Sequence, residues 1–451
     1  MTLRVICVGA GIAGLSAAVA LRKHVSRIIL LEAAEGVETM NVRAAGIALL
    51  SCGSHVLKET LGLDPVEHVN AVQLESIKML KWKDGSLERE IPAARNDWYT
   101  VHRASLLDAL REKATSSVGE GAPARFLFGK KVVAVDVEAG KVTTHDGSTY
   151  EADLIIGGEG VRSITRKAIV AETTVQPSGL SVYRWIMSPS SWEHLSEKHK
   201  TVLNPLVGPN ARHLCVIDSP DKRLVLYRCH TSGLLNGAFT VPDYFLPNTS
   251  EDWAYSGSVD HLRPLTEDLP EPMRNLMRCV SSCGLWQLRK QAPLRTWNKG
   301  KAIILGDAAH PMLPFQAMAG SLAMEDAEAL AYHLNEVGWQ ADRVPEALSQ
   351  VFCTRFLRCS LIQHFANNSS FGNEFMEEAE RWSLERAGRN GDDMVPVSKA
   401  VDDVVQRDIA KKVAETVAKV DVRAASGWIT NYKLREFLEN GGEYILERPY
   451  V

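Results

Sequence analysis

The 451-residue sequence lacks the features that mark several classes of protein. It contains no apolar run long enough to span a membrane and no charged-apolar-small leader, so we expect a cytoplasmic protein without a membrane span. Lys and Arg total 51 against 55 Asp and Glu, and the net charge of −4 disfavours a nucleic-acid-binding surface. No internal repeat or low-complexity tract interrupts the chain.

Metal-binding cysteine patterns are also missing. The chain has eight cysteines, but they form no C-x-x-C pairs with partnering histidines. Cys279 and Cys283 lie close together, yet no second pair or nearby histidine completes a zinc site. We therefore expect reduced thiols and no metal ion.

What the chain does contain is the composition of a globular protein, with 45% hydrophobic and 24% charged residues. Its length favours two or three domains. The N-terminal pattern predicts a strand over 4–8, a helix over 15–23 and a second strand over 28–31 that ends at Glu32. This is the βαβ unit in which dinucleotide-binding fingerprints occur.

Three glycines after the first strand fit that fingerprint. Gly9 permits the tight turn, Gly11 lets a pyrophosphate approach the backbone, and Gly14 lets the helix pack closely on the strand. The amides at the helix start then face the phosphates, and Glu32 can accept hydrogen bonds from the adenosine ribose. This context favours a dinucleotide site over a glycine-rich turn without a ligand.

Two later segments repeat the combination of a buried strand and glycine. A strand over 153–156 precedes the segment GGEG, and a strand over 301–305 precedes Gly306 and Asp307. The Asp307 carboxylate suits either a helix cap or a ribitol hydroxyl. A β-hairpin is expected from the runs 131–137 and 141–144.

Changes in the pattern of apolar and turn residues divide the chain into four segments. Short β-rich runs with frequent turn residues fill 177–297, and helical periodicity dominates after the third cluster. We therefore predict an α/β fold with a Rossmann-like nucleotide-binding domain (1–176 and 298–370), an inserted β-sheet substrate domain (177–297) and a C-terminal helical region (371–451).

The three clusters, in this order, resemble the single-component FAD-dependent aromatic monooxygenases. The similarity is greatest to the salicylate-hydroxylase-like group, which includes many fungal enzymes of secondary metabolism, and it runs to about residue 368. It implies a GR2-type FAD-binding domain and insertion of one oxygen atom from O2 into an electron-rich aromatic small molecule through a C4a-hydroperoxyflavin. The sequence contains one complete dinucleotide-binding fingerprint. This fits an enzyme that keeps FAD bound and binds NADPH or NADH only transiently.

The resemblance also implies cofactor contacts residue by residue. The N-terminal fingerprint would bind the ADP half of FAD, the segment RAAGIALL would lie beside the isoalloxazine, and Arg103 would contact the linker. Asp307 would bind the ribityl chain. The predicted contacts are Gly9, Gly11, Gly14, Glu32, Ala33, Arg43, Gly46, Ile47, Arg103, Glu159, Asp307, Pro314, Ala319 and Gly320.

Two positions depart from the family pattern. Glu159 stands where the motif usually carries Asp, and the longer side chain displaces the carboxylate in a loop that also meets the nicotinamide coenzyme. Met318 and Ala319 stand where Gln-Gly is usual. We expect the helix that begins near Ala319 to turn its amides toward the flavin's pyrimidine edge, and Met318 to lie against the ring or the cofactor entry. Glu325 and Asp326 are expected to begin the polar side of this helix.

Arg184 is the first candidate for a catalytic contact. Alternation along the predicted strand sends Tyr183 and Trp185 to one face and Val182, Arg184 and Ile186 to the other. An arginine between apolar neighbours needs an anionic or hydrogen-bonding partner. That partner is either the flavin or a substrate oxygen, as in related fungal enzymes with a similar Tyr-Arg segment, or a carboxylate in a structural ion pair.

Tyr227 and His310 are further catalytic candidates. Tyr227 lies in a predicted strand that would face the substrate cavity, and the alternative is an ordinary core or surface tyrosine. His310 follows the flavin aspartate and has the chemistry of a general base, whereas the family's histidine is more often structural.

Several functions stay open at this point. The oxygenation is either phenol hydroxylation or indole 2,3-epoxidation with rearrangement, because an indole needs no base to be nucleophilic. A flavin-dependent reductase or dehydrogenase on the same fold is the alternative enzyme, and a non-catalytic flavin-binding protein is the third class. We expect an aromatic or indole substrate and O2 as partners of a monomer or homodimer, with no nucleic acid.

Overall fold

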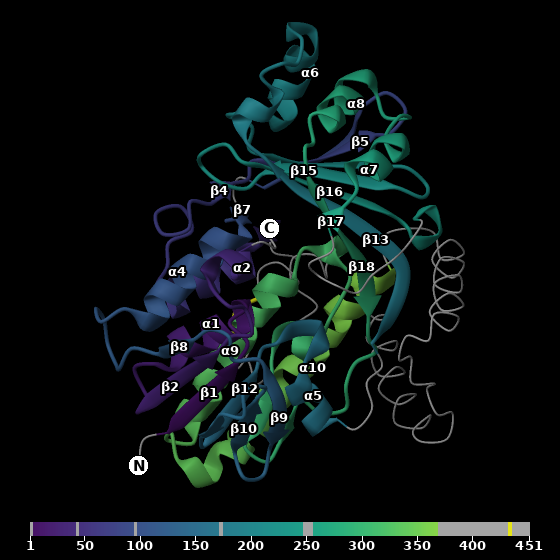
Figure 1. The fold of residues 1–451 in the computed structure, drawn as a ribbon. Helices are drawn as coiled ribbons and strands as arrows, with labels where there is room; N and C mark the ends of the chain where they lie inside the picture. Colours follow the sequence, from purple (N-terminus) through teal and green to yellow (C-terminus); the bar gives the residue numbers. More distant parts are fainter. Residues whose placement is uncertain are drawn as a thin grey trace, which may run out of the picture.

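The computed structural model describes residues 3–41, 45–93, 97–170, 175–246, 256–368 and 432–434. These residues form two stacked halves, with a six-stranded sheet in the lower half and an eight-stranded sheet in the upper half (Figure 1). The predicted C-terminal helical region lies outside the described residues apart from 432–434. None of the described helices has the length and apolar character that crossing a membrane requires.

The six-stranded sheet confirms the predicted α/β fold. Its order is β19-β20-β12-β1-β2-β8, and every pair in it except β19-β20 is parallel. The three strands that precede the glycine clusters, β20, β12 and β1, are neighbours, so their carboxyl ends meet at the edge where ligands bind in open α/β sheets. The bounds are β1 Arg4–Val8, β2 Arg27–Leu31, β8 Arg125–Leu127, β12 Leu154–Gly157, β19 Asn298–Lys299 and β20 Ala302–Ile304.

Helix α1 is buried on nearly all sides, because its small and apolar residues pack against both α4 and α9. Helix α9 in turn packs against α10. The helices of this half are α1 Ile12–Leu21, α2 Val37–Asn41, α3 Ser51–His55, α4 Arg103–Thr115, α5 Ile164–Ile169, α9 Ala319–Glu336 and α10 Val344–Asn368, and a π-helix, Val56–Thr60, follows α3.

The eight-stranded sheet has the order β17-β18-β13-β16-β15-β14-β5-β6. Strands β5 and β6 come from the first segment of the chain, and β5 joins β14 by the one parallel pairing found in this sheet among the described residues. The upper sheet therefore extends beyond the predicted insertion at 177–297, whose boundaries stay a prediction. The strands are β5 Ser76–Lys81, β6 Leu87–Pro92, β13 Gln176–Met187, β14 His213–Asp218, β15 Arg223–Arg228, β16 Leu235–Pro242, β17 Ser256–Gly257 and β18 Cys283–Lys290.

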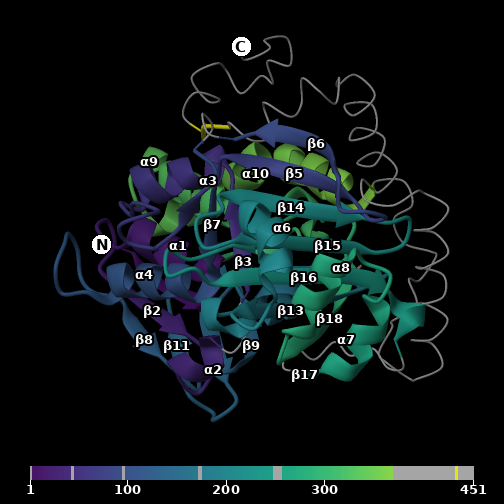
Figure 2. The ribbon, with the colours of Figure 1, turned by 90° about the horizontal axis from the view of Figure 1, so that it is seen from above.

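The two faces of the upper sheet have different environments. One face packs under helices α6 Glu197–Val207, α7 Val259–Leu265 and α8 Glu271–Arg278, which lie over the sheet in Figure 2. Tyr183 and Trp185 belong to that core, whereas Ile186 packs against the core of the lower half. The predicted alternation along β13 is thus confirmed, and the face that carries Arg184 is turned toward the lower half.

Two three-stranded sheets complete the described fold. In the first, β9 Val132–Asp136 pairs antiparallel with β10 Lys141–Thr144, which confirms the predicted hairpin, and β11 Thr149–Glu151 adds a third strand. The second has the order β3-β7-β4 and contacts β15 and β16 of the upper sheet, so it lies where the two halves meet. Its strands are β3 Gly46–Leu49, β4 Val72–Gln73 and β7 Tyr99–His102.

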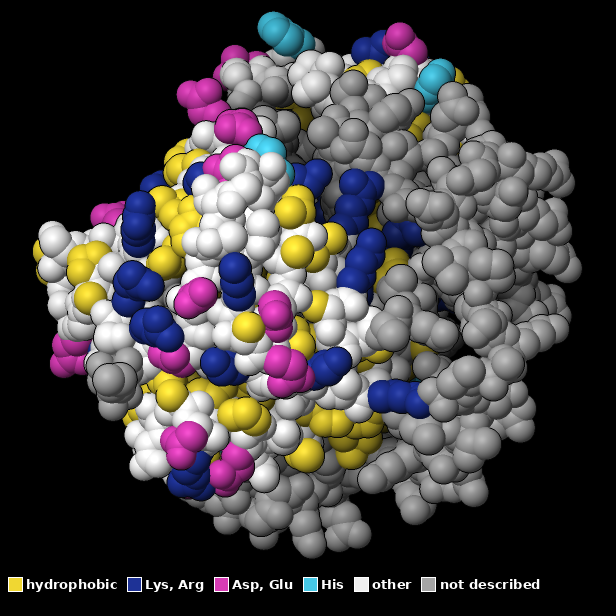
Figure 3. Space-filling model, turned by 60° about the horizontal axis from the view of Figure 1, so that its bottom comes forward, with side chains coloured by type: hydrophobic (Ala, Val, Ile, Leu, Met, Phe, Trp, Pro, Cys, Tyr) yellow, Lys and Arg dark blue, Asp and Glu magenta, His cyan; other side chains and the backbone are white. Residues whose placement is uncertain are grey.

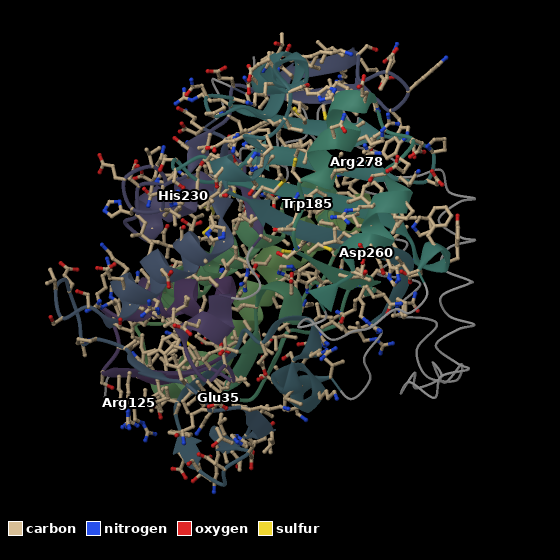
Figure 4. All side chains as sticks on the ribbon, turned by 45° about the horizontal axis from the view of Figure 1, so that its top comes forward. Glu35, Arg125, Trp185, His230, Asp260 and Arg278 are labelled. Atoms are coloured by element: carbon tan, nitrogen blue, oxygen red, sulfur yellow. The ribbon has the colours of Figure 1, made fainter. Side chains whose placement is uncertain are left out.

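Trp185 and Gly237 offer a test of the upper core, which contains Trp185 (Figure 4). They are paired across β13 and β16, and a Cβ on Gly237 would lie 2.0 Å from the Trp185 indole. Because overpacking a core costs about 1–3 kcal/mol, we expect Gly237→Ala to lower the free energy of unfolding in urea by that amount. Gly36→Ala, whose added Cβ meets no described atom within 4 Å, is the control. Equal unfolding midpoints for the two variants would contradict this packing.

Candidate functional site

The turns after β1 and β12 press together at the carboxyl edge of the lower sheet. Gly9 has a φ of +87°, and a Cβ there would lie 2.9 Å from the Cα of Glu159. A Cβ on Gly14 would lie 2.1 Å from the carbonyl oxygen of Gly9. Only glycine fits these two positions, because the start of α1 packs directly on both turns.

The start of α1 is open to an anion. Gly11 is the N-cap residue, and none of the described side chains caps the helix, whose first amides have no intrahelical acceptor. Beside them, Glu32 Oε2 accepts a hydrogen bond from the amide of Ala10 at 2.8 Å, and Oε1 accepts one from Ala34 at 2.9 Å. These bonds fix the carboxylate at the end of β2 and leave lone pairs for a further donor. Ala33, next in sequence, is exposed.

Glu159 directs its carboxylate into α5. Oε1 accepts hydrogen bonds from the amide and hydroxyl of Thr165 at 2.9 and 2.7 Å, and Oε2 accepts one from the hydroxyl of Ser163 at 2.7 Å. The longer side chain therefore ties the glycine turn after β12 to the first turn of the next helix. Its contact with a cofactor stays a prediction.

Asp307 lies in the 3₁₀ helix Gly306–Ala308 directly after β20. No hydrogen bond from the described residues reaches its carboxylate. Burial raises the pKa of Asp307, and the positive charges of His310, Arg103, Arg184 and Arg166 oppose that rise. A half-buried carboxylate among cations, with its lone pairs free, is a ready acceptor for the hydroxyl groups of a ligand.

The loop after Asp307 reaches α9 through a strained turn. The 3₁₀ helix Pro314–Gln316 begins at the exposed Pro314 and ends at Ala317, whose φ of +55° is left-handed. Ala319 is helical and so adopts a backbone conformation that alanine tolerates, whereas Ala317 carries the left-handed strain of this segment. Met318 is 1% exposed and packs in the core of the lower half. Whether it also meets a cofactor ring stays a prediction.

Helix α9 begins at Ala319 without a cap from any side chain in the described part of the chain, and its first amides have no acceptor within the helix. Next to it, a Cβ on Gly320 would lie 3.6 Å from Ile12 and 3.7 Å from Ile47. The starts of α1 and α9 therefore converge beside β3. Two uncapped helix starts at one place favour an anionic ligand.

Arg184 and Tyr227 occupy the face of the upper sheet that is turned to the lower half. The Arg184 guanidinium carbon lies 5.8 Å from the centre of the Trp286 ring, and burial lowers the pKa of Arg184. No described carboxylate forms an ion pair with it. Tyr227 is 7% exposed, burial raises its pKa, and its ring lies against Gly46 of β3.

His310 is held by α9. Its Nε2 lies 2.7 Å from Asp326 Oδ2, and the two side chains are 2% and 0% exposed. Burial disfavours a charged ring, but Cys359 and Asp326 together raise the pKa of His310 well above its usual value. A ring that keeps its proton does not accept another, so this geometry favours the structural role over the general base.

The expectation that Glu325 and Asp326 begin a polar side of α9 is wrong, because they are 1% and 0% exposed. Arg358 of α10 binds both oxygens of Glu325 at 2.7 and 2.8 Å, and Arg355 Nε lies 3.0 Å from Asp326 Oδ1. The guanidinium of Arg358 also lies 4.1 Å from the centre of the Tyr432 ring. Buried charges must be paired, and here each acid finds its arginine one helix later in the chain.

This ion cluster includes the one group of potential metal ligands found among the described residues. His310, Asp326 and Cys359 offer ligand atoms within 4.8 Å of one another. Asp326 is already engaged by Arg355, whose charge opposes a cation at this place.

Two further arginines were not singled out from the sequence. Arg166 is 3% exposed and donates to the carbonyl of Ala308 at 3.1 Å, which ties α5 to the Asp307 turn. Arg223 binds both oxygens of Asp218 at 2.6 and 2.8 Å, and its guanidinium lies 5.2 Å from the centre of the Phe315 ring. Alternation along β15 would have placed Arg223 on the same face as Tyr227.

Of the remaining predicted cofactor contacts, Gly46 and Arg103 lie within the described residues. The amide of Gly46 donates to Asn236 Oδ1 at 2.6 Å, which joins β3 to the upper sheet. Arg103 begins α4, and its charge reaches Asp307. Arg43 lies outside the described residues. Figure 3 shows several Lys and Arg side chains close together on one face of the described surface.

The chain matches the family described as FAD binding domain over residues 2–220 and 275–344. It is also 31% identical over 350 residues to hispidin-3-hydroxylase of Neonothopanus nambi, which covers 73% of this chain and 79% of that protein. The chain belongs to the FAD-dependent aromatic monooxygenases.

Two solved structures share the fold of this monooxygenase. Salicylate hydroxylase in a substrate complex has a TM-score of 0.68 at 23% identity, with 96% of this chain and 97% of that one covered. CtdE in complex with FAD and substrate 4 has a TM-score of 0.70 at 20% identity, with 86% and 99% covered.

The site of the monooxygenase fits FAD at both ends of the cofactor. The turn at Gly9 and the uncapped start of α1 suit a pyrophosphate, and the fixed carboxylate of Glu32 suits a ribose. Asp307 offers free lone pairs to ribityl hydroxyls, and the uncapped start of α9 suits the flavin's electron-rich edge.

Glu32 provides a test of this fit. Because a hydrogen bond to a charged group contributes about 1.5–3 kcal/mol, we expect Glu32→Ala to weaken FAD binding by about tenfold or more. The measurement is a fluorescence titration of the folded apoprotein with FAD. Glu35→Ala removes the same charge from an exposed position in the same segment (Figure 4) and serves as the control. Equal FAD affinities for the two variants would overturn the assignment of Glu32.

Proposed function

We propose that this monooxygenase uses NAD(P)H and O2 to hydroxylate an electron-rich aromatic ring, and that a phenolic oxygen of the substrate binds Arg184. The observation that carries the proposal is a half-buried guanidinium that forms no ion pair or hydrogen bond with a described carboxylate, although the charge of Asp307 reaches it. A phenolate or a ring-bound oxygen supplies a hydrogen-bond acceptor that the described residues do not offer to Arg184.

The protein's part in the reaction is binding, orientation and exclusion of water. When bound, FAD supplies the oxygen-activating chemistry, with NADPH or NADH as a transient reductant. Glu32 and the amides of α1 hold the ADP half, Asp307 holds the ribityl chain, and the amides near Ala319 favour negative charge on the flavin. The face of the upper sheet closes the site, and Arg184 donates hydrogen bonds to the substrate from it.

Hydroxylation of a phenol is favoured over indole epoxidation on two grounds. The charge of Arg184 would lower the pKa of the phenol, so its proton can pass to solvent water as the substrate binds, and His310, which Asp326 already holds, is not required as a base. The fungal relative is named as a hydroxylase. Indole 2,3-epoxidation with rearrangement remains the second reaction for this site, because a guanidinium can equally orient an indole product oxygen.

Turnover under labelled oxygen tests the proposed function. The enzyme is incubated with NADPH or NADH, 18O2 and matched panels of phenols and indoles. We expect one labelled oxygen atom in the product for each NAD(P)H consumed, with phenols as the faster substrates. Oxidation of NAD(P)H without incorporation into any substrate would assign the chain to the reductases, and turnover of indoles alone would assign it to the epoxidases.

Replacement of Arg184 tests its role at the substrate. We expect Arg184→Met to lower kcat/KM by about 10²-fold, because a charged hydrogen bond of about 2–3 kcal/mol is lost. We also expect more hydrogen peroxide per NAD(P)H, and an intermediate result for Arg184→Lys. Arg278→Met removes an exposed guanidinium from α8 (Figure 4) and is the control. Unchanged turnover and coupling in Arg184→Met would refute this role.

A further inference from the structure

The buried carboxylate of Asp326 binds both ends of the turn that carries Asp307. Asp326 Oδ2 accepts a hydrogen bond from the amide of Gly306 at 2.9 Å and lies 2.7 Å from Nε2 of His310. Gly306 and His310 flank Asp307 in the sequence, so the 306–310 turn is fixed at two points by a single oxygen atom. Asp326 itself lies on α9, the helix whose start belongs to the same site.

The charge of Asp326 is balanced from the other side by α10. Its Oδ1 lies 3.0 Å from Arg355 Nε, and both side chains are 0% exposed. Burial alone would raise the pKa of Asp326, but His310 and Arg355 outweigh it and lower the pKa to about 2. The carboxylate is therefore ionised at neutral pH, as it must be to hold a protonated His310.

We propose that Asp326 is a positioning residue for the cofactor: it holds the 306–310 turn so that Asp307 meets FAD, and it keeps a positive charge on His310 beside Asp307. The proposal rests on the proposed contact between Asp307 and FAD. His310 then acts through electrostatics on Asp307 rather than as a base toward the substrate.

Glu325 is a matched neighbour that separates positioning from stability. It precedes Asp326, is 1% exposed and lies 2.7 Å from the same Arg355. Its side chain binds arginines of α10, whereas the hydrogen bonds to Gly306 and His310 belong to Asp326. Neutralising either acid leaves an excess buried arginine charge, so the two changes destabilise the fold in the same way. Of the two changes, the one at Asp326 removes the negative charge that binds the protonated His310 and weakens the hold on the turn.

The experiment compares FAD binding by Asp326→Asn and Glu325→Gln. We expect Asp326→Asn to raise the Kd for FAD by about tenfold or more, and Glu325→Gln to raise it by less than about threefold, at similar melting temperatures. An equal rise in the Kd for FAD in the two variants would overturn the proposal, because it would show that Asp326 affects FAD binding only through the stability of the fold. If Asp326→Asn does not fold, His310→Gln takes its place: weaker FAD binding supports the proposal and unchanged binding overturns it.

A pH profile adds a readout that stability alone does not move. The charged and titratable groups that face His310 are Asp326, Cys359 and Asp307, with Arg355 behind Asp326. With Asp326 present, His310 stays protonated and the Kd for FAD is flat from about pH 6 to 8. In Asp326→Asn the ring loses the carboxylate that raises its pKa while burial still lowers it, so His310 gives up its proton at lower pH and FAD affinity falls as pH rises through that lowered pKa. A flat profile in Asp326→Asn would overturn the electrostatic part of the proposal.

Asp307→Ala separates failure of this inference from failure of the proposed cofactor contact. FAD binding by Asp307→Ala that equals the wild type would remove the contact on which the inference rests. Weak binding by Asp307→Ala together with normal binding by Asp326→Asn would leave that contact standing and reject the role of Asp326 alone.

Discussion

The lower half of the site depends on a buried ion cluster between two helices. Glu325 and Asp326 of α9 and Arg355 and Arg358 of α10 are all 0 or 1% exposed, so each charge relies on its partners. Removing one partner from such a pair costs about 3–5 kcal/mol, because a buried charge is left uncompensated. Within this cluster Asp326 is the member that binds the Asp307 turn, so it links that turn to α9, the helix whose start lies beside it.

The two halves of the molecule are joined at the site itself. Gly46 of β3 donates to Asn236 of the upper sheet and leaves no room for a side chain beside Tyr227. The strand expected to lie next to the flavin is therefore bonded directly to the sheet that carries Arg184. A substrate bound on that sheet is consequently held in a fixed relation to the cofactor, which is the condition for productive oxygen transfer.

Features that are local in the sequence could be predicted. The turn at Gly9 and the strands around it follow from adjacent residues, and β13 alternates as its sequence indicates, so Arg184 was placed on the correct face. The ion cluster was not predicted because Arg355, the partner of Asp326, lies on the next helix of the chain. An acidic residue with no basic partner nearby in the sequence is normally predicted to be exposed. The pairing of β5 with β14 likewise depends on residues far apart in the sequence, and no motif indicated that Glu159 binds Ser163 and Thr165 at the start of α5.

The most direct measurement is a crystal structure of the enzyme with FAD and a phenolic substrate bound. The account predicts that the Arg184 guanidinium donates a hydrogen bond to the phenolic oxygen and that Asp307 accepts one from the ribityl chain. A complex in which Arg184 instead pairs with a protein carboxylate, with the substrate oxygen bound elsewhere, would contradict it.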